Sequence, residues 1–224
     1  VQHEAYLRAL EDGGVSVMVL PADPDYPDSV FVEDTALCFP GFAVVTRPGA
    51  PSRAGETAAI GEALTTWYST IEQMESGHVD GGDVLWTGPE VLIGLSQRTD
   101  QIGAQELSDV LATHGLSPRT VETPPGVLHF KSDSSSLDES TILATARLAR
   151  SGVFDDYTVL VVPAGEEAAA NAICVNDRVL LPSGYPNTQA MLVEAGYDVV
   201  ALDNSQPQLI DGGLSCMSLR IPES

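Results

Sequence analysis

The feature of this chain that most constrains its fold is a repeat that recurs along the sequence. Most repeats contain two short apolar segments joined by a turn with Gly, Pro, Asn or Asp, which is the pattern of a β-hairpin. Equivalent points of successive repeats are roughly 40–50 residues apart, a spacing typical of radially repeated folds. The repeats span residues 28–47, 78–95, 127–144 and 171–182, and a fifth opens at 209–213 and contains Cys216.

Helical patterns lie between the hairpins. Apolar residues recur at spacings of three and four in 4–10, 56–75, 103–114 and 188–195. A repeat of hairpin plus helix predicts an α/β ring rather than an all-β propeller. In such a ring, the residues at the start of each first strand face a common axis, so distant segments meet there. The alternative is that similar turns recur by chance in an α/β chain.

Composition limits the partners of the chain. Its 224 residues predict a single domain over 1–224. With 10 basic and 32 acidic residues, the chain should repel nucleic acid and attract a small cation, although a solvated acidic surface is the simpler interpretation of most of this charge. No apolar run is long enough to span a membrane. Three cysteines and no leader-like N-terminus predict a cytoplasmic protein without a disulfide framework.

Cys216 is the candidate nucleophile. It follows a Gly-Gly pair and is flanked by Ser215 and Ser218, a polar setting typical of a tight turn, whereas Cys38 and Cys174 lie in apolar segments. A cysteine attacks as its thiolate and needs a base or a positive environment nearby. The alternative is a buried structural thiol.

His129 and Asp80 are the candidates to complete a nucleophilic system. His129 occupies the same position in its repeat as Cys216 and could act as general acid and base, although a single histidine is more often structural. Asp80 opens the turn Asp80-Gly81-Gly82-Asp83 and could orient the imidazole. A simple turn aspartate is the alternative.

Charged residues of the first two repeats are candidates for binding a substrate. Glu33 and Asp34 are adjacent carboxylates in the otherwise apolar segment 29–35, which we interpret as a strand. Buried carboxylates need a partner, and a guanidinium matches their geometry. Arg53 and Arg98 follow the second segments of their repeats at corresponding places and could hold a substrate carboxylate; surface arginines paired with acidic residues are the alternative.

Together these segments resemble the dimethylarginine dimethylaminohydrolases of the guanidino-group-modifying (pentein) superfamily. The resemblance covers nearly the whole chain and is carried by residues 27–34, 46–53, 80–83, 94–99, 128–132 and 210–218. It implies a five-fold pseudosymmetric α/β propeller with one catalytic domain and a site on its axis. It also implies hydrolysis of asymmetric dimethylarginine or monomethylarginine to citrulline and a methylamine, without a metal or an organic cofactor.

The resemblance also implies roles for individual residues. Cys216 would attack the guanidinium carbon, His129 would protonate the departing amine and then activate water, and Asp80 would orient His129. The substrate-binding residues would be Glu33 and Asp34 for the guanidinium, Asp28 and the Ile210 carbonyl for the α-amino group, and Arg53 and Arg98 for the carboxylate.

The chain departs from the family pattern at its N-terminus. Family members begin with a further strand and a mobile loop, so we expect the N-terminal strand of the first repeat and the lid to be missing here. Two alternatives stay open: another guanidine-modifying hydrolase such as an arginine deiminase, and a catalytically impaired pentein that binds a small molecule. The expected partner is a small cationic guanidino compound, and a homodimer is a candidate assembly.

Overall fold

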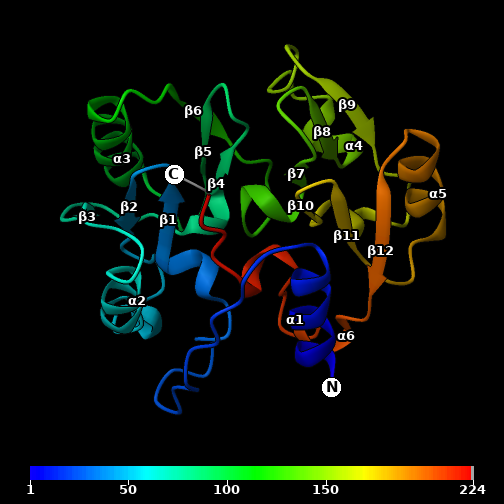
Figure 1. Ribbon diagram of the computed structural model, residues 1–224. Helices are drawn as coiled ribbons and strands as arrows, with labels where there is room; N and C mark the ends of the chain where they lie inside the picture. Colours follow the sequence, from blue (N-terminus) through cyan, green and yellow to red (C-terminus); the bar gives the residue numbers. More distant parts are fainter. Residues whose placement is uncertain (223–224) are drawn as a thin grey trace. The chain divides into compact units, whose positions relative to one another are not determined.

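The computed structural model describes residues 1–222, and these residues contain four three-stranded sheets (Figure 1). Each sheet has the same construction. Its first two strands form an antiparallel hairpin, and its third strand is parallel to the second and follows a helix. The repeat predicted from the sequence is therefore present four times as hairpin, helix and third strand.

Contacts divide the chain into two compact units. The 131–215 unit also contains residues 1–21, and the 22–130 unit also contains the segment that begins at Cys216. The single domain predicted over residues 1–224 stays a prediction.

The 22–130 unit contains two of the sheets. Its first repeat comprises β1 (Ala36–Phe39), β2 (Phe42–Val45), α2 (Thr57–Leu64) and β3 (Ile71–Gln73). Its second comprises β4 (Val84–Trp86), β5 (Val91–Leu95), α3 (Gln101–Thr113) and β6 (Pro118–Glu122). The β1–β2 turn uses Gly41 at φ 85°, a left-handed conformation that glycine adopts without steric cost.

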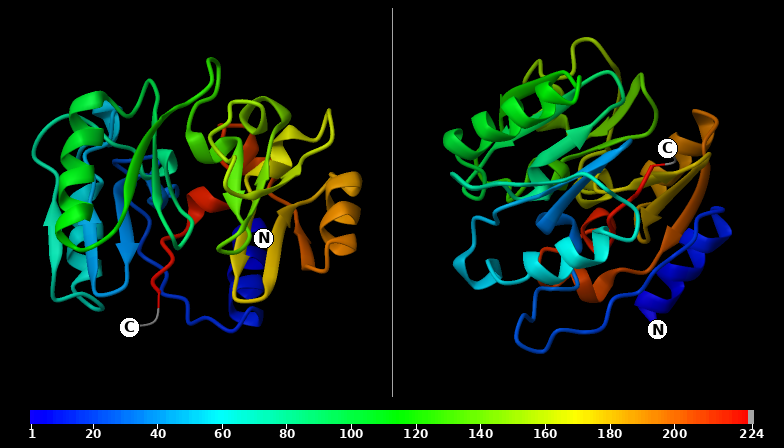
Figure 2. Two further views of the ribbon diagram at one scale, coloured as in Figure 1. Left: turned by 90° about the horizontal axis from the view of Figure 1, so that it is seen from above. Right: turned by 60° about the vertical axis from the view of Figure 1, so that its left-hand side comes forward.

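Packing of α3 on β5 and β6 closes the core of the 22–130 unit (Figures 1 and 2). Asp100 caps this helix, because its side chain accepts a hydrogen bond from the Gly103 amide at 2.8 Å. The fully buried Leu107 and Leu111 face the sheet with Val91 and Ile93. The core thus fixes β4 and β5, whose ends carry several candidate site residues.

The 131–215 unit, with residues 1–21, contains the other two sheets and four α-helices. Its strands are β7 (Ser134–Ser136), β8 (Thr141–Ala144), β9 (Thr158–Val161), β10 (Ile173–Val175), β11 (Arg178–Pro182) and β12 (Asp198–Leu202). Its helices are α1 (Gln2–Asp12), α4 (Ala146–Ala149), α5 (Pro186–Glu194) and α6 (Ser205–Gln208). Both α1 and α5 contact β12.

Short 3₁₀ helices precede the first strand of each sheet. They are η1 (Val32–Thr35), η3 (Gly81–Asp83), η4 (Phe130–Ser132) and η5 (Glu167–Ala170), and a further one, η6 (Ser215–Met217), contains Cys216. The sequence predicted that certain residues occupy the same position in successive repeats: Glu33, Asp34, Asp80, His129 and Cys216. In the structure, each of them lies in a 3₁₀ helix or directly before one.

Two secondary-structure predictions were wrong. The helix predicted over 56–75 ends at Leu64, and residues 71–73 form β3. The β-branched and aromatic residues Thr65-Thr66-Trp67 lower helix propensity, and they form turns closed by bonds from the Thr66 and Trp67 amides to the Ala63 and Leu64 carbonyls. The strand predicted over 29–35 is largely η1, whose acidic side chains contact arginines instead of lying in a sheet. No helix within residues 1–222 has the length and apolar character needed to cross a membrane.

Candidate active site

A buried imidazole–carboxylate pair forms the centre of the candidate site. His129 Nε2 lies 2.9 Å from Asp80 Oδ2, and the two residues are 8 % and 0 % exposed. Asp80 is itself fixed, since its Oδ1 accepts from the Gly49 amide at 2.7 Å and its amide donates to Thr99 Oγ1 at 3.1 Å. The structure therefore brings together these two residues, which are 49 positions apart in the sequence.

Carboxylates surround His129 and keep it protonated. Burial alone would lower its pKa, but the hydrogen bond to Asp80 and the nearby charges of Asp34 and Asp83 outweigh burial and raise the pKa to about 9. At neutral pH the imidazole is therefore a cation, the form that can give a proton to a leaving group.

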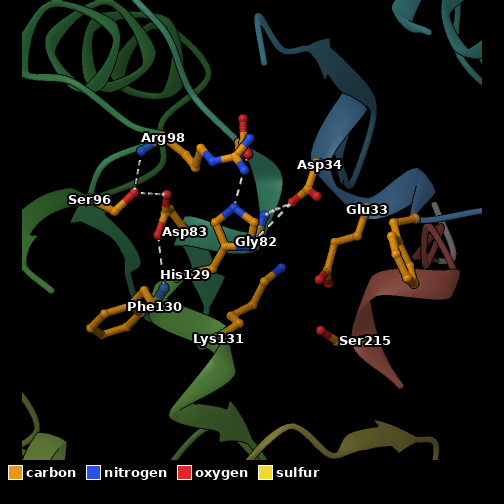
Figure 3. Close-up of polar contacts among 12 residues, drawn as sticks. Glu33, Asp34, Gly82, Asp83, Ser96, Arg98, His129, Phe130, Lys131 and Ser215 are labelled. Carbon is orange, nitrogen blue, oxygen red and sulfur yellow. Dashed lines mark hydrogen bonds and ion pairs between the residues drawn. The ribbon is translucent and has the colours of Figure 1, made fainter. Parts of the chain in front are cut away.

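Asp34 lies on the other side of the ring. Its Oδ1 is 4.0 Å from His129 Nδ1 and accepts from the Gly82 amide at 2.9 Å (Figure 3). Burial raises the pKa of Asp34, while His129 and Arg53 oppose that effect. Asp34 thus offers a buried, oriented carboxylate next to the acid–base group.

Gly82 makes this approach possible. A Cβ at this position would lie 2.8 Å from both Asp34 Oδ1 and His129 Nδ1, closer than carbon atoms approach such groups. The Gly81-Gly82 pair therefore serves close backbone approach, as its position in the turn indicated.

Asp83 is a site residue to which sequence analysis gave no role. It accepts hydrogen bonds from Ser96 Oγ at 2.6 Å and the Phe130 amide at 2.8 Å (Figure 3). It also accepts one from Thr99 Oγ1 at 2.7 Å. Burial raises its pKa, and His129 opposes this. Asp83 thereby joins η3, the loop after β5 and the segment that carries His129. The only sequence signal was its place in the Asp80–Asp83 turn.

Arg53 lies next to Asp34, and its role in binding a substrate carboxylate stays a prediction. It is 5 % exposed, and its guanidinium contacts Asp34 Oδ2 at 2.5 Å and Glu56 at 2.7 Å. The same group donates to the Phe31 carbonyl at 2.8 Å and to the Asp28 carbonyl at 3.3 Å. These bonds hold Arg53 among protein acceptors.

Glu33 also has an arginine partner that sequence analysis did not identify. Arg220 Nη2 donates to Glu33 Oε1 at 2.6 Å, and the Glu33 side chain is 3 % exposed. Arg220 lies outside every recurring motif, so nothing in the pattern indicated this pair. Both predicted guanidinium-binding carboxylates therefore carry a guanidinium of the chain itself.

The remaining predicted site residues lie in several separate segments. Arg98 is anchored through its amide, which donates to Ser96 Oγ at 2.9 Å. The Asp28 carbonyl accepts a hydrogen bond from Arg53 Nη2 at 3.3 Å. Cys216 lies half-buried in η6, and Ile210, 57 % exposed, belongs to the 131–215 unit. Their catalytic and binding roles stay predictions.

Cys38 is poorly suited to attack. Burial raises its pKa to about 11, so it stays a thiol at neutral pH. Burial likewise raises the pKa of Cys174. This leaves Cys216 as the better candidate nucleophile.

One group of side chains within residues 1–222 has the spacing of a metal site: Asp34, Asp80 and His129 offer ligand atoms within 4.8 Å of one another. The same three residues form the hydrogen-bonded cluster around His129, in which Asp80 Oδ2 lies 2.9 Å from Nε2 and Asp34 Oδ1 lies 4.0 Å from Nδ1.

Sequence comparisons reveal related proteins. A family model described as arginine deiminase matches residues 60–123. The chain is 42 % identical over 221 residues to the N(G),N(G)-dimethylarginine dimethylaminohydrolase of Pseudomonas aeruginosa, a match covering 98 % of the chain and 87 % of that protein. The protein of the same name from Streptomyces coelicolor is 35 % identical over 227 residues, which cover 99 % and 85 % of the two chains.

Solved structures of related proteins also match this chain. A serine variant of the P. aeruginosa enzyme in complex with citrulline matches with a TM-score of 0.95 at 42 % identity, covering 98 % of this chain and 87 % of the other. The product-bound N-terminal domain of ArgZ, a cyanobacterial arginine dihydrolase, matches with a TM-score of 0.87 at 18 % identity, covering 99 % and 85 %. The second match shows similarity of fold alone.

Proposed function

Because this chain belongs to the dimethylarginine dimethylaminohydrolase family, we propose that it hydrolyses Nω-methylated arginines to citrulline and a methylamine. The substrates would be asymmetric dimethylarginine and monomethylarginine. The observation that carries the proposal is the protonated His129 held between Asp80 and Asp34. This arrangement combines a proton donor with a carboxylate that can bind a planar cation.

The family and its solved structures also confirm the predicted fold class, the α/β pentein fold. The recurring repeats and the motif resemblance had both pointed to it. The fold alone does not select a substrate, because it hosts several reactions on guanidino groups.

Covalent catalysis by Cys216 is the first step of the proposed mechanism. The Cys216 thiolate attacks the guanidinium carbon, and the bond from that carbon to the methylated nitrogen breaks. His129 gives its proton to the departing amine, leaving a thiouronium on the sulfur. The cationic substrate favours the thiolate, so the nucleophile is activated as the substrate binds.

Hydrolysis of the intermediate completes the cycle. The now neutral His129 takes a proton from water, which adds to the thiouronium carbon, and the carbon–sulfur bond then breaks to release citrulline. Asp80 fixes the orientation of the ring through both steps and stabilises its protonated form.

Substrate binding uses charge complementarity. Glu33 and Asp34 would hold the guanidinium, Asp28 and the Ile210 carbonyl the α-amino group, and Arg53 and Arg98 the carboxylate. Arg53 also contacts Asp34, Glu56 and backbone carbonyls, which would fix its position beside the guanidinium-binding carboxylates.

An arginine deiminase is the second candidate function. The family model that matches residues 60–123 carries that description. The two reactions share the nucleophile and the histidine and differ in whether the leaving nitrogen is methylated. Relative rates with arginine and dimethylarginine therefore separate them.

Citrulline release tests the proposal. The chain should form citrulline from dimethylarginine faster than it forms citrulline from arginine or N-carbamoylputrescine from agmatine. Substitution Cys216→Ser should abolish turnover, whereas Cys38→Ser should retain it, because the Cys38 thiol is buried and protonated. A folded chain that forms no ureido product from any of the three would favour a pentein that only binds small molecules. Equal effects of the two substitutions would contradict the assignment of the nucleophile.

We further propose a cytoplasmic location, which the scarcity of cysteine favours. The predicted homodimer also stays a proposal. Light scattering after size-exclusion chromatography would give the molar mass that decides it.

A further inference from the structure

Arg220 joins the segment that carries Cys216 to one of the predicted guanidinium-binding carboxylates. It follows Cys216 by four positions, and both residues belong to the 22–130 unit, as does Glu33. Arg220 Nη2 donates to Glu33 Oε1 at 2.6 Å, and Nη1 donates to the Ser218 carbonyl and to Ser218 Oγ, each at 3.1 Å. One guanidinium therefore bridges η1 and the segment that contains the candidate nucleophile.

Burial makes this partner important for Glu33. The Glu33 side chain is 3 % exposed, whereas the Arg220 side chain is 37 % exposed. An ionised carboxylate that is taken out of water needs an opposite charge to offset its lost hydration. Arg220 supplies that charge together with a directed hydrogen bond, so Glu33 has both a counter-ion and a defined position for its Oε1.

The neighbouring carboxylate adds to the need for a counter-ion. Asp34 follows Glu33 in η1 and is 4 % exposed. Burial is the main cause that raises the pKa of Asp34, and the negative charge of Glu33 also raises it. A cation on Glu33 offsets this repulsion, so that both carboxylates can stay ionised side by side, as the binding of a cationic substrate requires.

We propose that Arg220 is a positioning residue, which keeps Glu33 ionised and oriented to bind the substrate guanidinium. The inference rests on the proposed function, in which Glu33 binds that cation. Arg220 acts through Glu33 and not on the substrate itself. Its loss should therefore weaken the binding of a cationic ligand more than that of a neutral ligand with the same amino acid groups.

Two ligands test this preference. Dimethylarginine and L-citrulline share the α-amino and carboxylate groups, but only dimethylarginine carries a positive charge at its other end. In a Cys216→Ser background that prevents turnover, Arg220→Gln should weaken dimethylarginine binding roughly 10- to 100-fold, the range for a lost hydrogen bond to a charged group. The loss for citrulline should be at least about fivefold smaller, because its ureido group is neutral. Isothermal titration calorimetry gives both dissociation constants.

Three results of this titration would overturn the inference. Equal losses for both ligands would mean that Arg220 supports the site as a whole and not the cation-binding carboxylate. Tighter binding of dimethylarginine would mean that Arg220 competes with the substrate for Glu33. Unchanged binding of both ligands would mean that Glu33 keeps its position without Arg220.

A double-substitution cycle tests the route through Glu33. When Glu33→Gln is also present, the carboxylate that Arg220 holds is gone, so adding Arg220→Gln should change dimethylarginine binding by no more than about twofold. The same large loss with and without Glu33→Gln would contradict the inference, because Arg220 would then act independently of Glu33.

Arg220→Lys keeps the inference testable if Arg220→Gln fails to fold. Lysine keeps the charge beside Glu33 but lacks the planar fork that joins Glu33 to Ser218. It should therefore lose part of the affinity for dimethylarginine, with the same preference between the two ligands. Losses that are equal for both ligands, or absent for both, would contradict the inference.

Arg119→Gln is the matched control. Arg119 forms an ion pair with Glu90 in the same unit, with Nε 2.7 Å from Oε2 and Nη2 2.8 Å from Oε1. Its side chain is 40 % exposed, close to the 37 % of Arg220. The substitution should leave both dissociation constants unchanged. A loss of dimethylarginine binding as large as in Arg220→Gln would reveal a general effect of removing positive charge and would overturn the inference.

The outcome is distinct from failure of the proposed function. If the unsubstituted chain forms no citrulline from dimethylarginine, the function fails. If it does form citrulline, but the Arg220 variants bind the two ligands as the parent does, only the positioning role fails.

Discussion

At the residue scale, the candidate site is defined by negative charge gathered around one imidazole. His129 lies 2.9 Å from Asp80 and 4.0 Å from Asp34, and Asp83 adds a third buried carboxylate nearby. Each of these charges favours the protonated ring. Proton transfer by His129 should therefore persist well above the ordinary pKa of histidine.

A pH profile tests this dependence. The pKa of about 9 is raised, so the protonated ring predominates below pH 9 and is lost as pH rises through that value. The rate of amine departure should fall over the same interval. Asp80→Asn removes the hydrogen-bonded charge, so the basic limb of the kcat profile should move to lower pH, by at least about one unit.

Glu72→Gln is the matched control for that substitution. Glu72 Oε1 lies 2.9 Å from His114 Nε2, a histidine–carboxylate pair outside the site, so its loss should leave the profile in place. A basic limb that does not move in Asp80→Asn would remove Asp80 from the proton-transfer system.

Sequence analysis identified residues that occupy the same position in successive repeats. It missed residues that belong to no motif. Asp80 and His129 were found because each opens its repeat, and the structure joins them. Glu56 and Arg220 gave no such signal, because a carboxylate or arginine in an acidic chain is an ordinary surface residue until its contacts are known. The environment of Arg53 likewise depends on three-dimensional packing.

At the element scale, the turn η3 allows the close contacts of the site. Its glycines let Asp34 and His129 approach the backbone. Sequence analysis found this turn and most hairpins, because glycine and proline mark their turns within a few residues of sequence. It missed β3, β6, β9 and β12, because these third strands are stabilised by parallel pairing with distant residues.

Substitution Gly82→Ala tests the role of η3. The added methyl group would lie 2.8 Å from Asp34 Oδ1 and His129 Nδ1 and must displace one of them. We expect a loss of about 1–3 kcal/mol in unfolding free energy, the usual cost of overpacking, and a fall in kcat/KM of more than roughly tenfold. Denaturant unfolding and citrulline assays measure the two effects.

Gly61→Ala is the matched glycine substitution. Its Cβ would meet nothing closer than 3.5 Å, and it lies within α2, where alanine is favoured over glycine. Activity should be unchanged and stability equal or higher. If Gly82→Ala behaves like Gly61→Ala, the close approach has no functional consequence.

At the scale of the whole chain, a formal net charge of −22 opposes compaction. Resemblance over nearly the full length allowed the fold class to be predicted, and solved relatives confirm it. The domain count and the homodimer stay predictions, because the periodicity of a sequence carries little information on contacts between domains or between subunits.

Salt should stabilise the chain. Raising ionic strength from ~0.01 to ~0.1 M shortens the screening length from about 30 to about 10 Å, so repulsion among the carboxylates falls. Tm should rise by about 2–4 °C for each kcal/mol gained. Sodium chloride and tetramethylammonium chloride should act alike if screening is the cause. A Tm that is constant or falls with both salts would contradict this account of the charge.

The most direct test of the central claim is to quench the chain during turnover of dimethylarginine and locate any covalent adduct by peptide mass spectrometry. The proposed mechanism predicts a thiouronium on the peptide that contains Cys216, formed with loss of dimethylamine and absent in Cys216→Ser. The same adduct on Cys38 or Cys174, or citrulline formation that survives Cys216→Ser, would contradict it.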